Sequence, residues 1–210
     1  MPLSATIQKG NNTLALWTIT EPVSFFENNV NLSPDELQIY RCFKNESRKK
    51  EWLAVRCLLQ ETLKMKPQIE YSETGKPFLK NHPSKLSISH SRKMAGILLS
   101  NNKLTGIDIE EITRPIDKVA SRFLSESERM LIEKSGLEYG KILSWCTKEA
   151  IFKAMNHCNV DFSTQIIIEK ITPDSNIEAR FIDHGVDIKI KLEYLLTDQH
   201  AVVWTSTNDM

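Results

Sequence analysis

Two short segments of this 210-residue chain contain residue types that could bind a divalent cation and a polyphosphate. Residues 106–110 (GIDIE) have the composition of a β-strand, and residues 141–154 (KILSWCTKEAIFKA) have that of an α-helix. Together they contain three carboxylates and the two lysines Lys148 and Lys153. Carboxylates are oxygen ligands for divalent cations, and lysines pair with phosphate oxygens. The two segments therefore indicate a candidate site for transfer of a phospho-group.

The strand segment places its acidic residues on one face. Side chains alternate along a strand, so Asp108 and Glu110 point the same way while Ile107 and Ile109 point into the core. Gly106 lies on the carboxylate face, where its missing side chain would let a ligand approach. Two carboxylates this close repel each other unless a cation or a basic group lies between them. The alternative interpretation is an edge strand with a solvated acidic face.

The helical segment places an acid and a base one turn apart. Glu149 and Lys153 are four residues apart and share a face. The alternative is a surface ion pair, which would contribute roughly 0.3–0.5 kcal/mol. Apolar neighbours such as Trp145 and Phe152 indicate that this face is only partly exposed. Lys148 points in another direction, and we expect it to reach a different phosphate oxygen.

Three further segments contain groups that could bind phosphate. Residues 86–91 (LSISHS) end a predicted strand with hydroxyls and the imidazole of His90, although a lone histidine is commonly structural. Residues 74–77 (TGKP) predict a turn that carries Lys76. Arg48 and Arg56 lie on a predicted helix, as either a solvated face or a phosphate-binding edge.

Other phosphate-binding and hydrolytic motifs are absent from the sequence. It contains no G-x-x-x-x-G-K-[ST], G-x-G-x-x-G, H-E-x-x-H or G-x-S-x-G motif. With only 7 glycines, a loop that cradles phosphate through backbone amides is not expected. Anion binding is therefore expected to come from side chains.

The composition excludes several classes of partner. Basic and acidic residues both number 27, so no overall field attracts nucleic acid or a membrane. No apolar run approaches the roughly 18 residues of a membrane span, and the first residues lack the order of a signal peptide. The four cysteines, which form no C-x-x-C, are expected to be small buried residues in a reducing compartment. We therefore expect a cytoplasmic protein.

The periodicity of the chain predicts an α+β fold. Capping boxes at residues 33–36 and 125–128 predict helix starts, and the second helix should end near Gly136. Further helices are expected over residues 47–64 and 141–155. Residues 183–185 are the expected hairpin turn. Strands are expected over residues 14–19, 86–90, 95–99, 104–110, 164–171, 177–182, 186–196 and 201–205. A division near residues 100–104 predicts two halves, 1–103 and 104–210.

Taken together, five segments resemble the 4′-phosphopantetheinyl transferases, of the longer pseudo-dimeric type typified by the surfactin-synthetase-activating enzyme. These segments occur in the order of that family, and the pair G-x-D-x-E and W-x-x-K-E-A-x-x-K is highly specific. They are residues 74–77, 87–91, 106–110, 122–128 and 145–154.

The resemblance implies an enzyme that moves the phosphopantetheine arm of coenzyme A onto a serine of an acyl or peptidyl carrier protein. It also implies two similar α+β halves in a monomer, with coenzyme A in the cleft between them. Mg²⁺ would be held by Asp108, Glu110 and Glu149. Lys153 would contact phosphate, as would Lys148 at a second position.

On the nucleotide side, the resemblance implies contacts from Lys76, Ser89 and His90, and it suggests Arg48 and Arg56 for the 3′-phosphate. Asp108, Glu149 and Lys153 would be the catalytic residues. The sequence leaves open whether Glu149 is the general base, a metal ligand or both.

Two other functions compete with this interpretation. A Mg²⁺-dependent nucleotide hydrolase would use the same carboxylates with water as the nucleophile. A module that only binds coenzyme A or a carrier protein is the other alternative, although the intact site argues against it. The sequence does not identify the carrier. An expected docking patch beside the cleft could include Arg114, Lys118 and Arg122.

Overall fold

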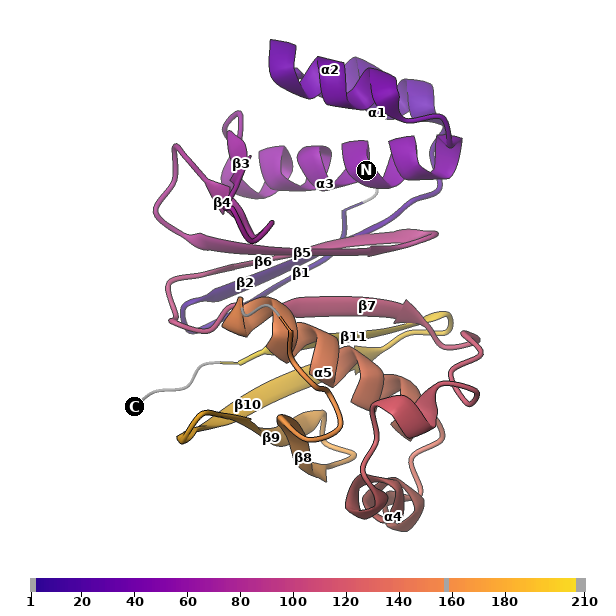
Figure 1. Cartoon of the computed structure of the whole chain (residues 1–210). Coiled ribbons are helices and arrows are strands. Elements are labelled where there is room, and N and C mark those ends of the chain that lie inside the picture. Colours follow the sequence, from indigo (N-terminus) through magenta and orange to yellow (C-terminus); the bar gives the residue numbers. More distant parts are fainter. Residues whose placement is uncertain (1–2, 157–158, 207–210) are drawn as a thin grey trace.

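The computed structural model describes residues 3–156 and 159–206, which form two antiparallel sheets with helices on their outer faces (Figure 1). The mixed α+β class predicted from the sequence is confirmed. The two sheets face each other in the middle of the molecule, and each has one principal helix on its far side. A site between the sheets can therefore draw side chains from both parts of the chain.

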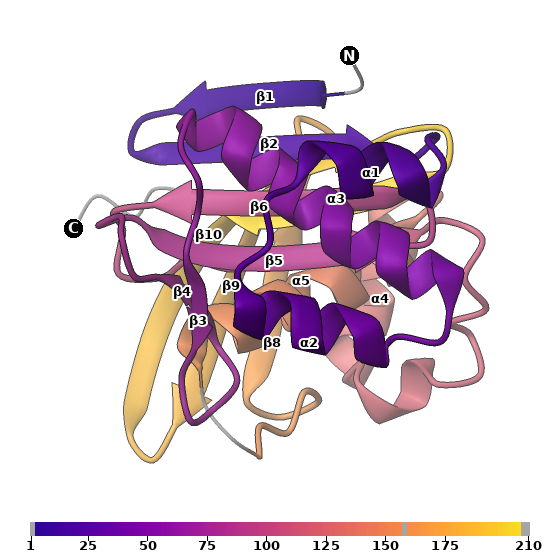
Figure 2. The same ribbon diagram turned by 90° about the horizontal axis from the view of Figure 1, so that it is seen from above.

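The N-terminal sheet has six strands in the order β1-β2-β6-β5-β4-β3. Helix α3 packs across strands β2, β5 and β6, and α1 and α2 lie outside it, as seen from above in Figure 2. The strands are β1 Leu3–Lys9, β2 Asn12–Thr18, β3 Ile69–Tyr71, β4 Pro77–Leu79, β5 Lys85–Ser91 and β6 Met94–Ser100. The helices are α1 Val23–Asn29, α2 Pro34–Cys42 and α3 Glu46–Leu63.

The C-terminal sheet has five strands in the order β7-β11-β10-β9-β8. Helix α5 packs on this sheet, and α4 lies against β8 and α5. The strands are β7 Ile107–Glu111, β8 Ile166–Ile171, β9 Asn176–Asp183, β10 Val186–Leu196 and β11 His200–Thr205. The helices are α4 Glu126–Ser135 and α5 Gly140–Met155, preceded by the short 3₁₀ helix Ala120–Arg122.

Alternating side chains let the central strands contribute to two apolar clusters at once. In β2, Ala15 and Trp17 face α3, while Leu14 and Leu16 face the other sheet. In β7, Ile107 joins the cluster between the sheets, as does Ile109. The remaining members of this central cluster are Met94, Leu98, Val202 and Trp204. Burial of this apolar face holds the two halves together.

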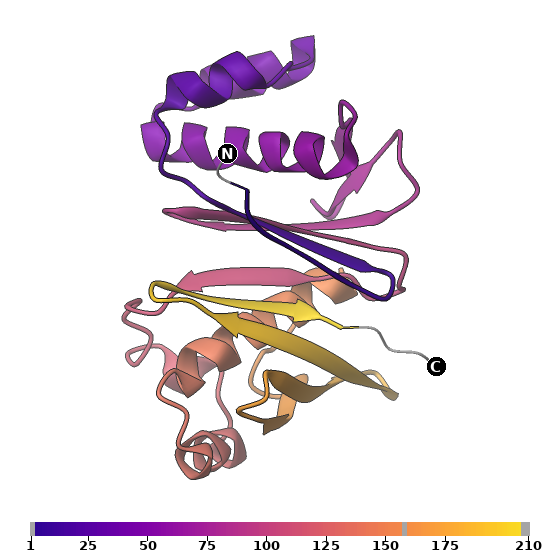
Figure 3. The same cartoon turned by 180° about the vertical axis from the view of Figure 1, so that it is seen from behind.

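The β1–β2 hairpin and the β10–β11 hairpin lie at the back of the molecule (Figure 3). They add polar contacts between the halves. The Asn12 side-chain amide of β2 donates to the carbonyl of Thr205 in β11 at 3.0 Å. Lys9 of β1 pairs with Glu193 of β10 at 2.8 Å, although the lysine is largely exposed. These contacts join residues from opposite ends of the chain.

Most predicted elements are confirmed, including both capping boxes. The hydroxyls of Ser33 and Ser125 accept from the backbone N–H three residues later, and the glutamates at those positions reach back. Gly136 ends α4 in the left-handed conformation, with φ of 63°. The expected hairpin turn lies between β9 and β10, where His184 and Gly185 both have positive φ.

Some short elements of the structure were not predicted from the sequence. Strand β1, helix α1, strand β3 and strand β4 are all seven residues or shorter. Helix α1 has no side-chain cap, so it lacks the kind of capping box from which the start of α2 was predicted. Strands β3 and β4 have only three residues each, which is too short for an apolar alternation to be recognised.

The cysteine prediction is partly wrong. Cys57 and Cys146 are buried free thiols, as expected. Cys42 is exposed near the end of α2, because α2 packs on α3 through other residues such as Tyr40. Cys158 lies outside the described residues. Within residues 3–156 and 159–206, no helix is long and apolar enough to cross a membrane.

Candidate active site

A cleft of about 490 Å³ lies where β5 of the N-terminal half meets β7 and α5 of the C-terminal half. It brings together seven of the residues predicted from the sequence. They are Arg48, Lys76, Ser89, His90, Asp108, Glu110 and Lys153. Three predicted residues, Lys148, Glu149 and Arg56, do not line it.

The floor of the cleft contains an ion pair between β7 and α5. Asp108 is buried, and its Oδ1 atom accepts from Lys153 Nζ at 2.7 Å and from Ser89 Oγ at 3.0 Å. Lys153 Nζ also donates to the carbonyl of Ile107 at 3.1 Å. Within the described residues, the buried Oδ2 atom of Asp108 has no hydrogen-bond partner by geometry, although burial and the nearby charge of Asp108 raise the pKa of the Cys146 thiol beside this carboxylate. A buried oxygen without a partner is costly, so this atom is a candidate ligand for a cation.

Glu110 lies on the same face of β7 as Asp108, as the strand periodicity predicts. Its Oε1 atom accepts from Trp145 Nε1 at 2.9 Å, and Arg114 also donates to it. Burial, followed by the nearby charge of Asp108, raises the pKa of Glu110, while Trp145 and Arg114 oppose that shift. Arg114, predicted as part of a docking patch, is therefore an ion-pair partner at the edge of the cleft.

Glu149 is partly buried on α5 near the two acidic residues of β7. Burial, and then the charge of Asp108, raise the pKa of Glu149 to about 7. Lys153 opposes the shift but does not cancel it. A carboxyl with a pKa near neutrality exchanges protons readily at physiological pH, as a general base must.

His90, which was predicted to contact the nucleotide, also lines the cleft. Its Nδ1 atom lies 3.1 Å from Glu51 Oε2, and its Nε2 atom contacts the Arg48 guanidinium. An arginine can only donate, so Nε2 accepts and the Nδ1–H group donates to Glu51. Burial alone would raise the pKa of Glu51, but His90, Ser47 and Arg48 lower it. The Glu51 carboxylate thus orients His90.

Sequence reasoning missed Glu51, although a signal existed. Glu51 lies on α3 one turn after Ser47 and three residues after Arg48. This spacing places Ser47, Arg48 and Glu51 on one face of α3. The sequence analysis interpreted that face as either solvated or phosphate-binding, and it did not identify an acidic residue within it. Only the packing of α3 against β5 shows that His90 shares this face.

The turn at residues 72–77 closes the cleft over the end of α5. Lys76 Nζ donates to the carbonyl of Ala154 at 3.0 Å, and Thr74 Oγ1 donates to Asn156 Oδ1 at 2.7 Å. A cation at a helix C-terminus satisfies exposed carbonyls and complements the helix dipole. Burial lowers the pKa of Lys76, and Lys85 adds to the shift. Lys76 therefore lies at the cleft with its ammonium bound to protein.

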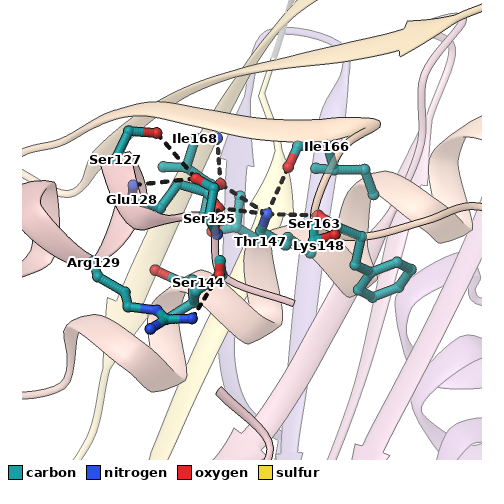
Figure 4. Close-up of polar contacts among 12 residues, drawn as sticks. Ser125, Ser127, Glu128, Arg129, Ser144, Thr147, Lys148, Ser163, Ile166 and Ile168 are labelled. Carbon is teal, nitrogen blue, oxygen red and sulfur yellow. Dashed lines mark hydrogen bonds and ion pairs between the residues drawn. The ribbon is translucent and has the colours of Figure 1, made fainter. Parts of the chain in front are cut away.

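The prediction that Lys148 contacts phosphate is wrong. Its ammonium is enclosed and hydrogen-bonded to Glu128 of α4 and to the carbonyls of Phe162 and Ile166, at 2.6–2.9 Å. Figure 4 shows Lys148 pointing toward Glu128, between α4 and the start of β8. Glu128 also accepts from the backbone N–H of Ser125 and of Ile168, both at 2.8 Å. The helix turns Lys148 about 100° away from Glu149, into the core.

The suggestion that Arg56 binds the 3′-phosphate is also wrong. Arg56 is buried, pairs with Glu36 of α2 at 2.9 Å and stacks on Trp52. Its NH1 group donates to the carbonyl of Trp52 at 3.1 Å. Arg56 thus joins α2 to α3. Arg48, two turns earlier, is the exposed arginine of this helix that reaches the cleft.

Gly106 has a different role from the one expected. It does not open the carboxylate face to a ligand, because a Cβ atom there would lie 1.9 Å from the carbonyl oxygen of Ala150. The missing side chain lets β7 approach the backbone of α5. That close approach brings Lys153 within reach of Asp108.

The oxygen atoms of these carboxylates are suitable ligands for a hard divalent cation, but they do not form a complete set of ligands. Among the residues that the structure describes, no three His, Cys, Asp or Glu side chains are grouped closely enough to hold a metal ion. Mg²⁺ is usually held by one or two carboxylates, with waters and substrate phosphates completing the set. The unpartnered Oδ2 of Asp108 and the nearby Glu110 match that requirement. The set Asp108, Glu110 and Glu149 stays a prediction.

Comparisons with known proteins place this architecture in a class. Residues 105–205 match the model of the 4′-phosphopantetheinyl transferase superfamily. This part of the chain, which contains β7, α5 and the rest of the C-terminal sheet, is therefore similar to members of that superfamily. The resemblance predicted from the sequence is confirmed at this level, whereas the pseudo-dimeric subtype stays a prediction.

Individual relatives agree with that assignment. The chain is 36% identical over 117 residues to 4′-phosphopantetheinyl transferase AcpT of Escherichia coli (strain K12), a match covering 50% of this chain and 57% of the relative. It is also 36% identical over 115 residues to AcpT of Salmonella typhi, covering 50% of this chain and 58% of that relative. The chain thus spans a little over half the length of the curated relatives it matches.

Proposed function

We propose that this protein transfers the 4′-phosphopantetheine group of coenzyme A to a serine hydroxyl of an acyl or peptidyl carrier protein. The reaction is Mg²⁺-dependent and releases adenosine 3′,5′-bisphosphate. The observation that carries the proposal is the shared cleft, where basic groups of one half face the Asp108–Lys153 pair of the other. Residues 1–103 would supply the nucleotide-side contacts, and residues 104–210 the metal site and catalytic helix.

In this proposal, Asp108, Glu110 and Glu149 would hold Mg²⁺, and the cation would neutralise charge on the pyrophosphate of coenzyme A. The chain's own groups bind and orient the substrate around it. Arg48, His90 and Lys76 line the cleft and would contact the nucleotide half of coenzyme A. Lys153 supplies positive charge near the leaving phosphate, because phosphoryl transfer depends on positioning and charge neutralisation.

The incoming nucleophile belongs to the carrier protein, so the enzyme needs a base but no nucleophile of its own. Glu149 takes the proton of the carrier serine, directly or through water, while the serine oxygen bonds to phosphorus. The bond from phosphorus to the bisphosphate then breaks, and the bisphosphate leaves with the electron pair. Without a bound cation, burial and the charge of Asp108 raise the pKa of Glu149 to about 7, and this supports the role of base as the alternative to metal ligation.

The proposal also includes a cytoplasmic, monomeric enzyme that has no nucleic-acid or membrane partner. Equal numbers of basic and acidic residues support this last part.

The test is a mass measurement. Purified protein, coenzyme A, Mg²⁺ and an apo carrier protein should give a carrier whose mass increases by one phosphopantetheine. Asp108→Asn serves as the inactive control. Unmodified carriers across fatty acid, polyketide and peptide pathways, with folded enzyme, would contradict the proposal. Release of the bisphosphate without any carrier would indicate a hydrolase instead.

A further inference from the structure

Strand β5 meets the free edge of β7 through two serines. Leu86 and Ile88 of β5 pack toward α3, so the alternating Ser87 and Ser89 face the C-terminal half. Ser87 Oγ accepts from the N–H of Ile107, and Ser89 Oγ accepts from the N–H of Ile109, each at 3.1 Å. These hydroxyls satisfy backbone donors that β7 would otherwise leave unpaired at the sheet edge.

The two serines differ in what else they contact. Among the described residues, Ser87 Oγ makes only its bond to β7. Ser89 Oγ also donates to Asp108 Oδ1 at 3.0 Å and accepts from Lys153 Nζ at 3.1 Å. A serine hydroxyl has one hydrogen to donate and two lone pairs to accept with. All three positions of Ser89 are therefore used, which fixes its orientation.

Ser89 and Lys153 both bind Oδ1 of Asp108, and this leaves the other oxygen free. The buried Oδ2 atom has no hydrogen-bond partner in the described part of the chain. Because two groups hold one oxygen of the carboxylate, the plane of the Asp108 carboxylate is fixed. A residue of the N-terminal half thus contributes to the orientation of this carboxylate.

We propose that Ser89 is a positioning residue that orients the Asp108 carboxylate and the Lys153 ammonium across the boundary between the halves. The inference rests on the proposed function, because it takes Asp108 as a ligand of the divalent cation. It differs from the sequence-based prediction that Ser89 binds coenzyme A directly. Its hydroxyl is already filled by protein groups.

The experiment compares Ser89→Ala with Ser87→Ala as a matched control. Each variant removes one buried acceptor from a β7 N–H, so both should lower the denaturation midpoint, and Ser89→Ala should lower it more because it also loses the bonds to Asp108 and Lys153. The main readout is Mn²⁺ binding by electron paramagnetic resonance, with coenzyme A present and carrier absent. Ser89→Ala should weaken Mn²⁺ binding about 10–100-fold, as is typical when a group that orients a metal ligand is removed. Ser87→Ala should bind Mn²⁺ like the wild type.

Two further measurements separate positioning from direct contact. Coenzyme A binding in the presence of a chelator should be the same for Ser89→Ala and the wild type. Ser89→Thr, which keeps the hydroxyl, should recover most of the lost Mn²⁺ affinity. Equal loss of Mn²⁺ affinity in both alanine variants, or unchanged affinity in Ser89→Ala, would overturn the proposal. Loss of coenzyme A affinity under chelator would show direct contact and would also overturn it.

Measurements on the wild-type protein separate a failure of this inference from a failure of the proposed function. If wild-type protein fails to bind Mn²⁺ and coenzyme A, the proposed function is wrong and the positioning role falls with it. If the wild type binds both and modifies a carrier while the serine variants behave alike, only the role of Ser89 is wrong.

Discussion

Helix α5 contains two lysines that pair with acids in contrasting ways. Lys148 and Glu128 have side-chain exposures of 0% and 1%, and Lys153 and Asp108 have 29% and 7%. The donors of Lys148 all have protein acceptors, and both oxygens of Glu128 accept hydrogen bonds. In the second pair, the Oδ2 atom of Asp108 lacks a partner among the described residues, and both side chains line the cleft.

The difference separates a structural pair from a candidate functional one. A buried ion pair with every hydrogen bond made holds elements together, here α4, α5 and β8. A pair at a cleft with an unsatisfied oxygen retains capacity for a ligand. Both lysines belong to one short motif, so the motif serves the fold on one side of the helix and the site on the other.

The largest effect is expected when Lys148 is replaced. Lys148→Met leaves Glu128 buried without its cation, and breaking such a pair costs about 3–5 kcal/mol of unfolding free energy. Urea denaturation measures this loss. The double variant Lys148→Met with Glu128→Leu should recover part of it, because no lone charge remains buried. Normal stability in Lys148→Met, with weaker coenzyme A binding, would contradict the structural role.

The same substitution at Lys153 should act mainly on activity. Lys153→Met removes the cation nearest the proposed leaving group, and kcat should fall about 10²–10³-fold, as when one transition-state donor is lost. Its unfolding free energy should fall less than that of Lys148→Met, because Asp108 keeps its bond to Ser89. Carrier modification followed by mass spectrometry measures the rate. Equal loss of stability in the two variants would erase the contrast between the pairs.

A smaller effect concerns the pH dependence of stability. The pKa of Glu149 rises from 4.5 to about 7 on folding, so the folded protein binds this proton more tightly than the unfolded chain. Stability contributed by this group is therefore full below about 4.5 and is lost as pH rises through about 7. Denaturation of wild type and Glu149→Gln in chelator, across this window, measures it. A difference between the two that does not change with pH would show that Glu149 does not titrate there.

The smallest effect is expected at Glu51. Glu51→Gln weakens the hold on His90, and losing a hydrogen bond of about 1 kcal/mol should raise KM for coenzyme A roughly fivefold with kcat retained. Ser47→Ala is the control, because it removes another partner of Glu51 without contacting His90. Steady-state kinetics at varied coenzyme A measures both. A fall in kcat with KM unchanged would place Glu51 in the chemical step.

Much of the candidate site could be predicted because its signals are local. The period of two in residues 107–110 correctly placed the acids and the isoleucines on opposite faces. The helical period placed Glu149 and Lys153 one turn apart, and the capping boxes marked two helix starts. Seven predicted residues meet at one cleft.

The wrong predictions concern residues whose side-chain direction depends on a partner that is distant in the sequence. Arg56 and Lys148 both looked available to phosphate, yet each is buried against a glutamate 20 residues away. Gly106 looked like an opening, yet α5 packs directly on it. No local pattern shows which face of a helix meets a neighbouring element, because burial is decided by packing.

The sequence by itself determined the chemistry that is available: an acidic strand, a lysine-bearing helix and a resemblance to one superfamily. The tertiary structure alone decided which lysine faces the cleft and which is locked in the core. It also placed Ser89 and Glu51 beside groups far away in the chain. The physical reason is that residue types and periods act over one or two turns, whereas the partner of a charged group is fixed by how sheets and helices pack.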